Sequence, residues 1–312
     1  MERIKGYRDL PEALRGATAA LGNFDGVHLG HRALISAARR ARPAGRHAVV
    51  TFEPHPRRYF RPAMPPFRLA TADERARILA SLGLDALFEL AFDEALAEMS
   101  PERFVAEVLA DGLGLSHVAV GEDFRFGKAR AGDVQILARA GAAHGIAVTA
   151  IALEGEGTPV SSSMIRTHIR EGRPDAAARL LGRWHTVSGP VLQGDQRGRT
   201  LGYPTANLAF GDQIVPAYGV YAAEVTVHDG PHAGRYPGVA SIGERPTFGI
   251  NAPNFEVHLF DFAGDLYGAE ISTGLVAFLR GEVRFDGADA LIAQMDRDSA
   301  DARAALAAPS PG

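Results

Sequence analysis

The sequence predicts two folds in one chain, an α/β domain built on a parallel sheet and an all-β antiparallel barrel with a terminal helix. Through residue 153, short apolar runs alternate with helical patterns, as in a parallel sheet covered on both faces. From His185 the apolar period becomes two, with Gly, Pro and Asn turns between short segments, which favours an antiparallel barrel or sandwich. The length of 312 residues also favours two domains.

The apolar runs of the first half have strand length, and each precedes a helix candidate. The expected strands cover residues 17–24, 46–52, 85–92, 117–121 and 146–153. The expected helices, with apolar residues three to four positions apart, cover residues 31–41, 72–83, 101–114 and 133–145. This βα repetition predicts a single parallel sheet.

The pattern changes after the polar, glycine-containing segment 154–163. Two short helices are expected next, ending at Gly172 and Gly182. The domain boundary then falls just after the second helix, and we divide the chain into residues 1–183 and 184–312.

Alternation and helical spacing predict the elements of the second half. On one face of an expected strand lie the apolar residues Tyr221, Ala223, Val225 and Val227. In the last pattern, residues 287–307, the apolar positions are Leu291, Ile292, Met295 and Leu306. We expect this final stretch to form a helix that packs on the barrel.

Composition limits the partners of the chain. Hydrophobic residues make up 46% and charged residues 22%, as in an ordinary soluble protein. The formal net charge of -4 argues against bulk attraction to nucleic acid or anionic lipid. There is no cysteine, no apolar leader at the start and no membrane-length apolar run. We expect a cytoplasmic protein with no nucleic-acid or membrane partner; oligomeric state is not predicted.

A strand, a tight turn and a helix start follow one another in LGNFDGVHLGHRALI, residues 21–35. The turn and the helix start contain Gly22, Asn23, Asp25, Gly26, His28, Gly30 and His31. Backbone N–H groups and the positive end of a helix attract anions, and glycine lets a phosphate approach closely. We therefore predict a phosphate site here, with the two imidazoles as hydrogen-bond donors.

Two other interpretations of His28 and His31 stay open on the residues alone. The histidines can cap a helix or bind a metal ion, and for an isolated HxxH these are the better explanations. The strand–turn–helix context favours phosphate, while the absence of cysteine and of a third ligand at regular spacing weakens the metal interpretation.

Four separated segments resemble one known family. They are GNFDGVHLGH, TFEPHP (51–56), GEDFRFGKARAG (121–132) and SSSMIR (161–166). Together they resemble the HxGH nucleotidyltransferases, and more narrowly the FMN adenylyltransferase (FAD synthetase) module of prokaryotic bifunctional riboflavin kinase/FMN adenylyltransferases. The resemblance implies a Rossmann-like domain in which the FMN phosphate attacks the α-phosphorus of ATP and pyrophosphate leaves. The task is then alignment and charge neutralisation, because a phosphate monoester is already largely ionised near neutral pH.

The same resemblance implies roles for individual residues. His28, His31 and Arg166 would be catalytic. The residues implied for ATP and phosphate binding are Gly22, Asn23, Asp25, Gly26, Gly30, Asp123, Ser162 and Ser163. Those implied for the isoalloxazine ring are Phe52, Pro54 and Phe124, although buried aromatics are more often plain core. The family more often has threonine at 163 and arginine at 164, where this chain has Ser163 and Met164.

A second glycine-rich segment, GDQRGRTLGYPTANL (194–208), ends in a Pro-Thr-Ala-Asn turn. It is not a Walker A loop, because GxxxxGK[ST] does not occur in the chain. The Thr205 hydroxyl and the Asn207 carboxamide offer two neutral oxygens suited to Mg²⁺ beside phosphates. On the residues alone, an ordinary glycine-rich hairpin is the better explanation.

The surrounding segments 216–225, 238–249 and 255–268 resemble riboflavin kinase. Alternation predicts that Glu256 and His258 point away from the apolar face of their strand. The resemblance aligns the catalytic glutamate of the family with Glu256, as general base for the terminal ribityl hydroxyl that attacks the γ-phosphorus of ATP. Without it, an exposed strand glutamate would be the better explanation.

For this half the resemblance implies further ligands. Gly198, Arg199 and Gly202 would contact ATP, and Thr205 and Asn207 would hold Mg²⁺. Tyr203 replaces the commoner phenylalanine. The implied kinase barrel and the adenylyltransferase module together cover nearly the whole chain.

The resemblance implies an enzyme that converts riboflavin to FMN and FMN to FAD, with ATP as co-substrate and Mg²⁺ as cofactor. Three alternatives stay open. The first half can be an inactive module beside an active kinase, the chain can be a flavin or nucleotide sensor, or His28 and His31 can serve a metal-dependent hydrolase. The sensor is disfavoured because the residues implied for catalysis and metal binding in both halves are retained, namely Thr205, Asn207, Glu256, His28 and His31.

Overall fold

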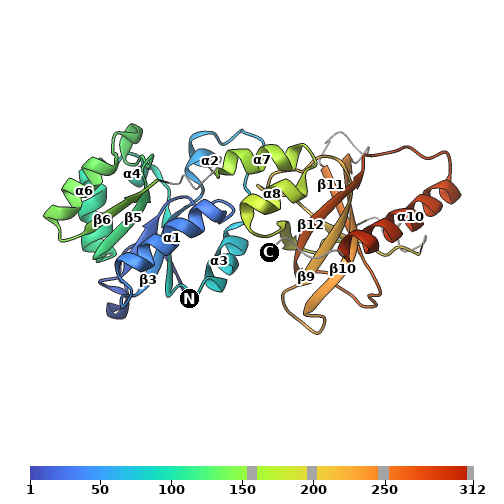
Figure 1. Cartoon of the computed structure of the whole chain (residues 1–312), viewed down its shortest axis with the longest axis horizontal. Coiled ribbons are helices and arrows are strands. Elements are labelled where there is room, and N and C mark those ends of the chain that lie inside the picture. Colours follow the sequence, from blue (N-terminus) through green and yellow to red (C-terminus); the bar gives the residue numbers. More distant parts are fainter. Residues whose placement is uncertain (153–159, 195–201, 245–252, 308–312) are drawn as a thin grey trace. The chain divides into compact units, whose positions relative to one another are not determined.

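The computed structural model describes residues 1–152, 160–194, 202–244 and 253–307. Gly198 and Arg199, which the sequence assigns to ATP, lie outside the described residues. The chain packs as two compact units (Figure 1). The first unit comprises Met1–Met64 and Ala72–Ser161, and the second comprises Pro65–Thr71 and Ser162–Gly312. The boundary at 183 remains a prediction about modules, whereas these units are defined by packing.

The first unit is built on a six-stranded parallel sheet in the order β1-β4-β3-β2-β5-β6. The strands are β1 (Glu2–Lys5), β2 (Thr18–Leu21), β3 (His47–Glu53), β4 (Ala86–Ala91), β5 (His117–Gly121) and β6 (Ala147–Ile151). Five of them were predicted, and the parallel α/β fold is confirmed. β1 was not predicted because its sequence, ERIK, is polar and carries no apolar run.

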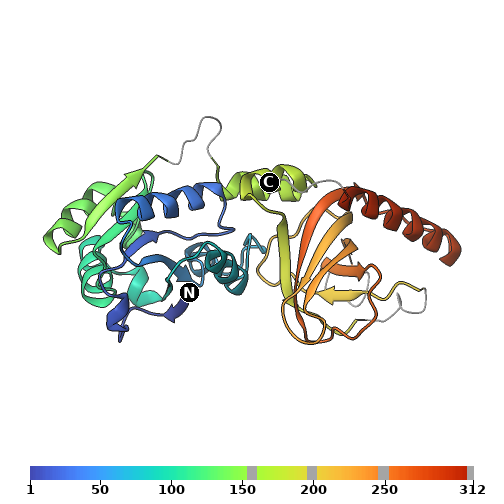
Figure 2. The same cartoon turned by 60° about the horizontal axis from the view of Figure 1, so that its bottom comes forward.

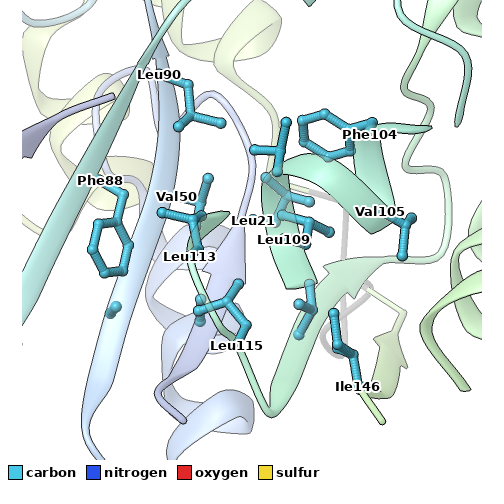
Figure 3. Packing of buried hydrophobic residues seen from close by; sticks show 14 of the residues in the cluster. Leu21, Val50, Phe88, Leu90, Phe104, Val105, Leu109, Leu113, Leu115 and Ile146 are labelled. Atoms are coloured by element: carbon cyan, nitrogen blue, oxygen red, sulfur yellow. The ribbon is translucent and has the colours of Figure 1, made fainter. Parts of the chain in front are cut away.

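Helices cover both faces of this sheet. The principal ones are α1 (Leu29–Ala41), α3 (Ala72–Ser81), η2 (Phe104–Gly112) and α6 (Val134–Ala143), with short turns at η1 (Glu12–Leu14), α2 (Pro56–Phe60), α4 (Glu94–Ala97), α5 (Pro101–Arg103) and η3 (Lys128–Arg130). The α1 and α3 side chains pack with Val49 and Leu87, whereas η2 and α6 pack with Val50 and Phe88. Neighbouring residues of one strand therefore lie in hydrophobic cores on opposite faces of the sheet, because side chains alternate along a strand. Figure 3 shows Val50 and Phe88 among the apolar side chains of the core that η2 and α6 cover.

The expected helix 101–114 differs from its prediction in type. Its first turn is helical, but η2 is a π-helix. Apolar spacing does not distinguish the two helix types over so short a stretch, because both place residues four or five apart on one face. At its end, Gly112 lies against Tyr7, where a Cβ atom would be 2.6 Å from the ring.

The second unit contains a six-stranded antiparallel sheet in the order β7-β12-β9-β10-β11-β8, which confirms the predicted all-β half. The strands are β7 (His185–Pro190), β8 (Ala206–Leu208), β9 (Gly219–Val227), β10 (Gly234–Glu244), β11 (Pro253–Leu259) and β12 (Glu270–Arg280). The inner face holds the alternating apolar residues predicted in β9 and β11. The last helix, α10 (Ala288–Leu306), packs on β9, β10 and β12 (Figure 2).

Two short helices and a detached segment complete the second unit. α7 (Ser162–Arg170) packs on α8 (Pro174–Leu181), which contacts β7 and β12 and ends at left-handed Gly182, as predicted. The detached segment 65–71 runs beside 212–214, where the backbone N–H groups of Phe67 and Arg68 donate to the Asp212 carbonyl at 3.0 and 2.9 Å.

Among the described residues, no helix is long and apolar enough to cross a membrane.

Charged side chains lie at the β3–β4 side of the first unit. Glu89 of β4 is buried and accepts hydrogen bonds from Arg3 Nε at 2.6 Å and from Arg75 Nη2 at 2.7 Å. Arg75, on α3, is 0% exposed and also pairs with Glu53 at 3.0 Å. Each buried charge is thus compensated by an opposite one, which is the condition for a charge to be tolerated inside a protein.

We predict that Glu89→Gln lowers the free energy of unfolding by about 3–5 kcal/mol, because it leaves the buried Arg75 poorly compensated. Urea unfolding of the full chain measures this. Glu107→Gln is the control, since it breaks an exposed pair with Arg103 and should leave the urea midpoint unchanged. Equal midpoints for wild type and Glu89→Gln would contradict the role of this cluster.

Candidate functional site

The predicted phosphate turn follows β2, at the point where the strand order of the parallel sheet reverses. From β2 the chain proceeds through β3 and β4 on one side and continues with β5 and β6 on the other, so β2 and β5 flank the reversal. Ligands of such sheets bind outside the carboxyl ends of the strands at this point. The predicted segments at residues 22–31, 51–56 and 121–132 follow or end β2, β3 and β5, and therefore share this edge.

The backbone of the turn is held in an uncommon conformation. Phe24, Gly26 and Val27 have positive φ angles of 48°, 82° and 43°. Glycine adopts this region freely, but a β-branched valine does so at a cost of order 1–3 kcal/mol. The Gly22 N–H donates to the Val50 carbonyl at 3.1 Å, and Thr51 Oγ1 donates to the Asn23 carbonyl at 3.0 Å. β3 therefore fixes the turn, and strain of this kind is typical of ligand sites.

His28 and His31 come together at the N-terminus of α1. His28 is the N-cap, and its Nδ1 accepts a hydrogen bond from the His31 N–H at 3.3 Å. The two rings stack with centroids 3.7 Å apart, and the Phe24 ring lies 5.0 Å from His31. A Cβ atom at Gly30 would lie 3.2 Å from the His28 ring, so glycine gives the imidazole room. The two histidines thus lie side by side at the start of α1.

The environment of His31 favours a neutral imidazole. Burial, with repulsion from His28, lowers the pKa of His31 well below the ordinary value of a histidine. Because His28 Nδ1 accepts a hydrogen bond, the proton of a neutral His28 ring lies on Nε2. Within the described residues, no group of three or more His, Cys, Asp or Glu side chains is arranged to hold a metal ion. Neutral N–H donors at a helix N-terminus suit a phosphate.

The other nucleotide residues predicted for the first half are divided between the units. Asp25 is buried in the turn, and Asp123 is exposed after β5. Ser162, Ser163 and Arg166 lie on α7, which belongs to the second unit. Arg166 is buried, donates from Nε to the Phe67 carbonyl at 2.8 Å and lies 5.4 Å above the Phe67 ring. The roles of these residues stay predictions.

A row of aromatic rings in mutual contact lies at the edge of the parallel sheet where its strands end. Phe52 contacts Phe92 and Phe104, with centroids 5.8 and 6.4 Å apart, and Phe124 stacks on Phe126 at 5.6 Å. At its other end, Phe60 lies 5.7 Å from Phe92 and is 63% exposed. Phe52 and Phe124 were predicted, whereas Phe60 was missed, because no periodic pattern separates an exposed ring from a core ring in the short α2.

Three of the predicted kinase residues, Thr205, Asn207 and Glu256, come together in the second unit. β11 pairs with β8 so that Glu256 is opposite Asn207. Thr205 Oγ1 lies 3.4 Å from Glu256 Oε2, and Asn254 Nδ2 donates to Glu256 Oε1 at 2.8 Å. Glu256 is half-buried on the outer face, while Phe255 and Val257 lie in the core. Asn254 was not predicted, although its place two residues before Glu256 puts it on the same face.

Asn207 is held from two sides. Its carbonyl accepts the Leu192 N–H at 2.8 Å, and its side chain lies over the backbone of Gly194. A Cβ atom at Gly194 would lie 2.3 Å from Asn207 Nδ2, so only glycine leaves the carboxamide where it is. Hydroxyl, carboxamide and carboxylate oxygens thus gather at one place, and this donor set fits Mg²⁺. Gly202 is exposed before this turn.

Comparisons with known proteins identify a family for each half of the chain. The sequence pattern of the FAD synthetase family matches residues 10–164, and that of the riboflavin kinase family matches residues 181–306. A bifunctional riboflavin kinase/FMN adenylyltransferase from Pseudomonas fluorescens is 43% identical, over 99% of each chain. The protein of the same description from Escherichia coli K12 is 39% identical over 97% of each chain.

A solved structure is similar along nearly the whole length. It is a Streptococcus pneumoniae protein described as a macrolide-efflux protein, with 29% sequence identity and a TM-score of 0.83. The match covers 97% of this chain and 99% of that one. Both folds therefore occur together in another chain.

We predict that His31 makes the fold less stable at acidic pH. The unfolded chain binds a proton on this ring near its ordinary pKa of about 6.5, whereas the native chain excludes it, so stability falls as pH drops below that value. The largest slope for one such group is about 1.4 kcal/mol per pH unit. Urea unfolding at about pH 7, 6 and 5 measures it.

In this experiment His31→Gln should lose less stability between about pH 7 and pH 5 than the wild type does. His144→Gln, which removes an exposed histidine, should behave like the wild type. Parallel losses in wild type and His31→Gln would show that His31 accepts its proton in the folded chain.

Proposed function

The chain belongs to the family of bifunctional riboflavin kinase/FMN adenylyltransferases, and on this premise we propose that residues 184–312 phosphorylate riboflavin to FMN and residues 1–183 adenylate FMN to FAD. ATP is the co-substrate of both reactions. The observation that carries the proposal is the meeting of Glu256 with Thr205 and Asn207, since a carboxylate beside two metal-binding oxygens is what phosphoryl transfer to an alcohol requires.

In the kinase half, Glu256 accepts the proton of the ribityl hydroxyl that attacks the γ-phosphorus of ATP. The γ-phosphorus–oxygen bond to ADP breaks as the new phosphate ester forms. In a loose transition state the hydroxyl proton leaves late, so the main task of the carboxylate is to orient the nucleophile. Hydrogen bonds from Asn254 and Thr205 to its two oxygens support this role, because they fix the plane of the carboxylate.

Magnesium is part of the proposal. Thr205 and Asn207 would hold it, and the Gly194 backbone beneath Asn207 keeps the carboxamide available. A bound Mg²⁺ would neutralise charge on the ATP phosphates. Gly198, Arg199 and Gly202 remain predicted nucleotide contacts.

In the adenylyltransferase half, an FMN phosphate oxygen attacks the α-phosphorus of ATP, and pyrophosphate leaves. The turn after β2 and the N-terminus of α1 offer backbone N–H groups, to which His28 and His31 add imidazole donors. Such donors stabilise charge on phosphoryl oxygens without requiring a strong base. Ser162, Ser163 and Arg166 keep the phosphate-binding role that the family resemblance implies for them, as a prediction.

The isoalloxazine ring is proposed to bind along the aromatic edge of the first unit. Phe52, Pro54 and Phe124 were assigned from the family, and the exposed Phe60 adds a face on which a planar ring can stack. The product of the kinase reaction is the substrate of the adenylation reaction, so riboflavin, FMN and ATP are the small-molecule partners. The cytoplasmic location stays a prediction.

We predict that the two reactions respond to different substitutions. Glu256→Ala should lower FMN formation from riboflavin by at least about a hundredfold and leave FAD formation from supplied FMN within about twofold, because it removes only the orienting carboxylate. His31→Ala should lower FAD formation by about tenfold or more and spare FMN formation. Chromatography of products with riboflavin or FMN, ATP and Mg²⁺ measures both. Loss of both reactions in either folded variant would contradict the assignment to two sites.

We also predict that Gly194→Ala lowers kinase activity by about tenfold or more while the fold persists. The new methyl group displaces only the end of the flexible Asn207 side chain, so the loss should match that of Asn207→Ala. Gly189→Ala is the matched control, because nothing lies within 4 Å of its Cβ position. A fully active Gly194→Ala enzyme would remove Asn207 from the metal site.

A further inference from the structure

The turn that carries Thr205 is held by a neighbour of Glu256 on the same strand. His258 lies two residues after Glu256 and shares its face of β11. His258 Nδ1 is 2.8 Å from the Pro204 carbonyl oxygen, and because a carbonyl only accepts, Nδ1 carries the proton and donates. Residues 204 and 205 are thus fixed by two adjacent outward side chains of one strand.

Tyr203 extends this contact to a different element. Its ring meets the His258 ring edge-on, with centroids 5.1 Å apart. Its hydroxyl donates to Asp296 Oδ1 on α10. Burial and the hydrogen bond to Asp296 raise the pKa of the Tyr203 hydroxyl, so the group stays a protonated donor.

α10 is a firm point of attachment for Tyr203. Two residues after Asp296, the buried Asp298 receives two hydrogen bonds from Arg280 at the end of β12, at 2.8 and 2.6 Å. One turn later, Ala302 is 0% exposed in the cluster that joins α10 to the barrel. A bidentate arginine–carboxylate pair with little exposure restricts both position and rotation of the helix.

From these contacts we infer that Tyr203 is a positioning residue of the kinase half, whose hydroxyl ties the Pro204–Thr205 turn to α10 through Asp296. The inference rests on the proposed kinase function. Thr205 then reaches Mg²⁺ and ATP from a turn anchored at both β11 and α10. The Tyr203 hydroxyl bonds to Asp296 on α10 rather than to Glu256, so its effect falls on nucleotide affinity through the position of the turn.

The test measures FMN formation from riboflavin by the full chain at varied concentrations of ATP with excess Mg²⁺. Tyr203→Phe keeps the ring against His258 and removes only the hydroxyl. We expect its KM for ATP to rise by about three- to tenfold, with kcat within about twofold, as for loss of one hydrogen bond to a carboxylate. FAD formation from supplied FMN should be unchanged.

Variants of the partner separate positioning from a general effect of α10. Asp296→Ala should raise the KM for ATP as Tyr203→Phe does, and the double variant should be no worse than either, because all three lack the same bond. Asp296→Asn retains an oxygen acceptor and should recover most of the affinity. Asp301→Ala is the matched control, since it removes an exposed carboxylate from the same helix away from the turn, and should match the wild type.

The inference is wrong if Tyr203→Phe has the wild-type KM, if the effects of Tyr203→Phe and Asp296→Ala add, or if kcat falls while KM is constant. Those outcomes require an active wild-type kinase. A wild-type protein that forms no FMN from riboflavin instead overturns the proposed function, so the two failures are told apart by the same assay.

Discussion

The antiparallel pairing of β11 with β8 decides which groups meet at the proposed kinase site. Glu256 is opposite Asn207 because the register also places Phe255 opposite Leu208 and Val257 opposite Ala206, and these four apolar residues fill the barrel interior. Since side chains alternate, a slip of one residue would bury Glu256 and expose Phe255. Hydrophobic burial therefore fixes the position of the carboxylate that we propose to be catalytic. The same register sets the place of the turn at Thr205.

The two units present their reactive groups in different ways. In the first unit, hydrogen-bond donors come from backbone N–H groups, the N-terminus of α1 and two stacked imidazoles. They lie at the point where the strand order of the parallel sheet reverses. In the second, side-chain oxygens gather on the outside of an antiparallel sheet. Donors suit an already ionised phosphate nucleophile and its leaving group, whereas oxygens suit a neutral alcohol that must lose a proton beside a metal. The chemistry of each proposed reaction thus agrees with the scaffold that carries it.

Much of this could be predicted from the sequence, for physical reasons that also explain the failures. Apolar patterns reflect burial directly, both as the alternation in β9 and β11 and as the βα repetition before residue 153. They therefore sufficed to predict both folds and the outward placement of Glu256. β1 was not predicted because its sequence is polar. The π-helical type of η2 was not predicted because apolar spacing does not reveal which carbonyl each N–H bonds to. Gly194 depends on a contact with the Asn207 side chain and Tyr203 on a contact with α10, and spacing along the chain encodes neither. Charge pairs such as Arg75 with Glu89 are hidden for the same reason. Asn254, by contrast, shares a face with Glu256 through the alternation of one strand and could have been predicted.

The second unit is assembled from two separate stretches of the chain, residues 65–71 and 162–312. A recombination point near residue 183 would also part α8 from β7 and β12, and would uncover Ala177, Ala178 and Leu181. By packing, neither unit is therefore one uninterrupted stretch of the chain. A single cut of the backbone therefore cannot release both packed units intact.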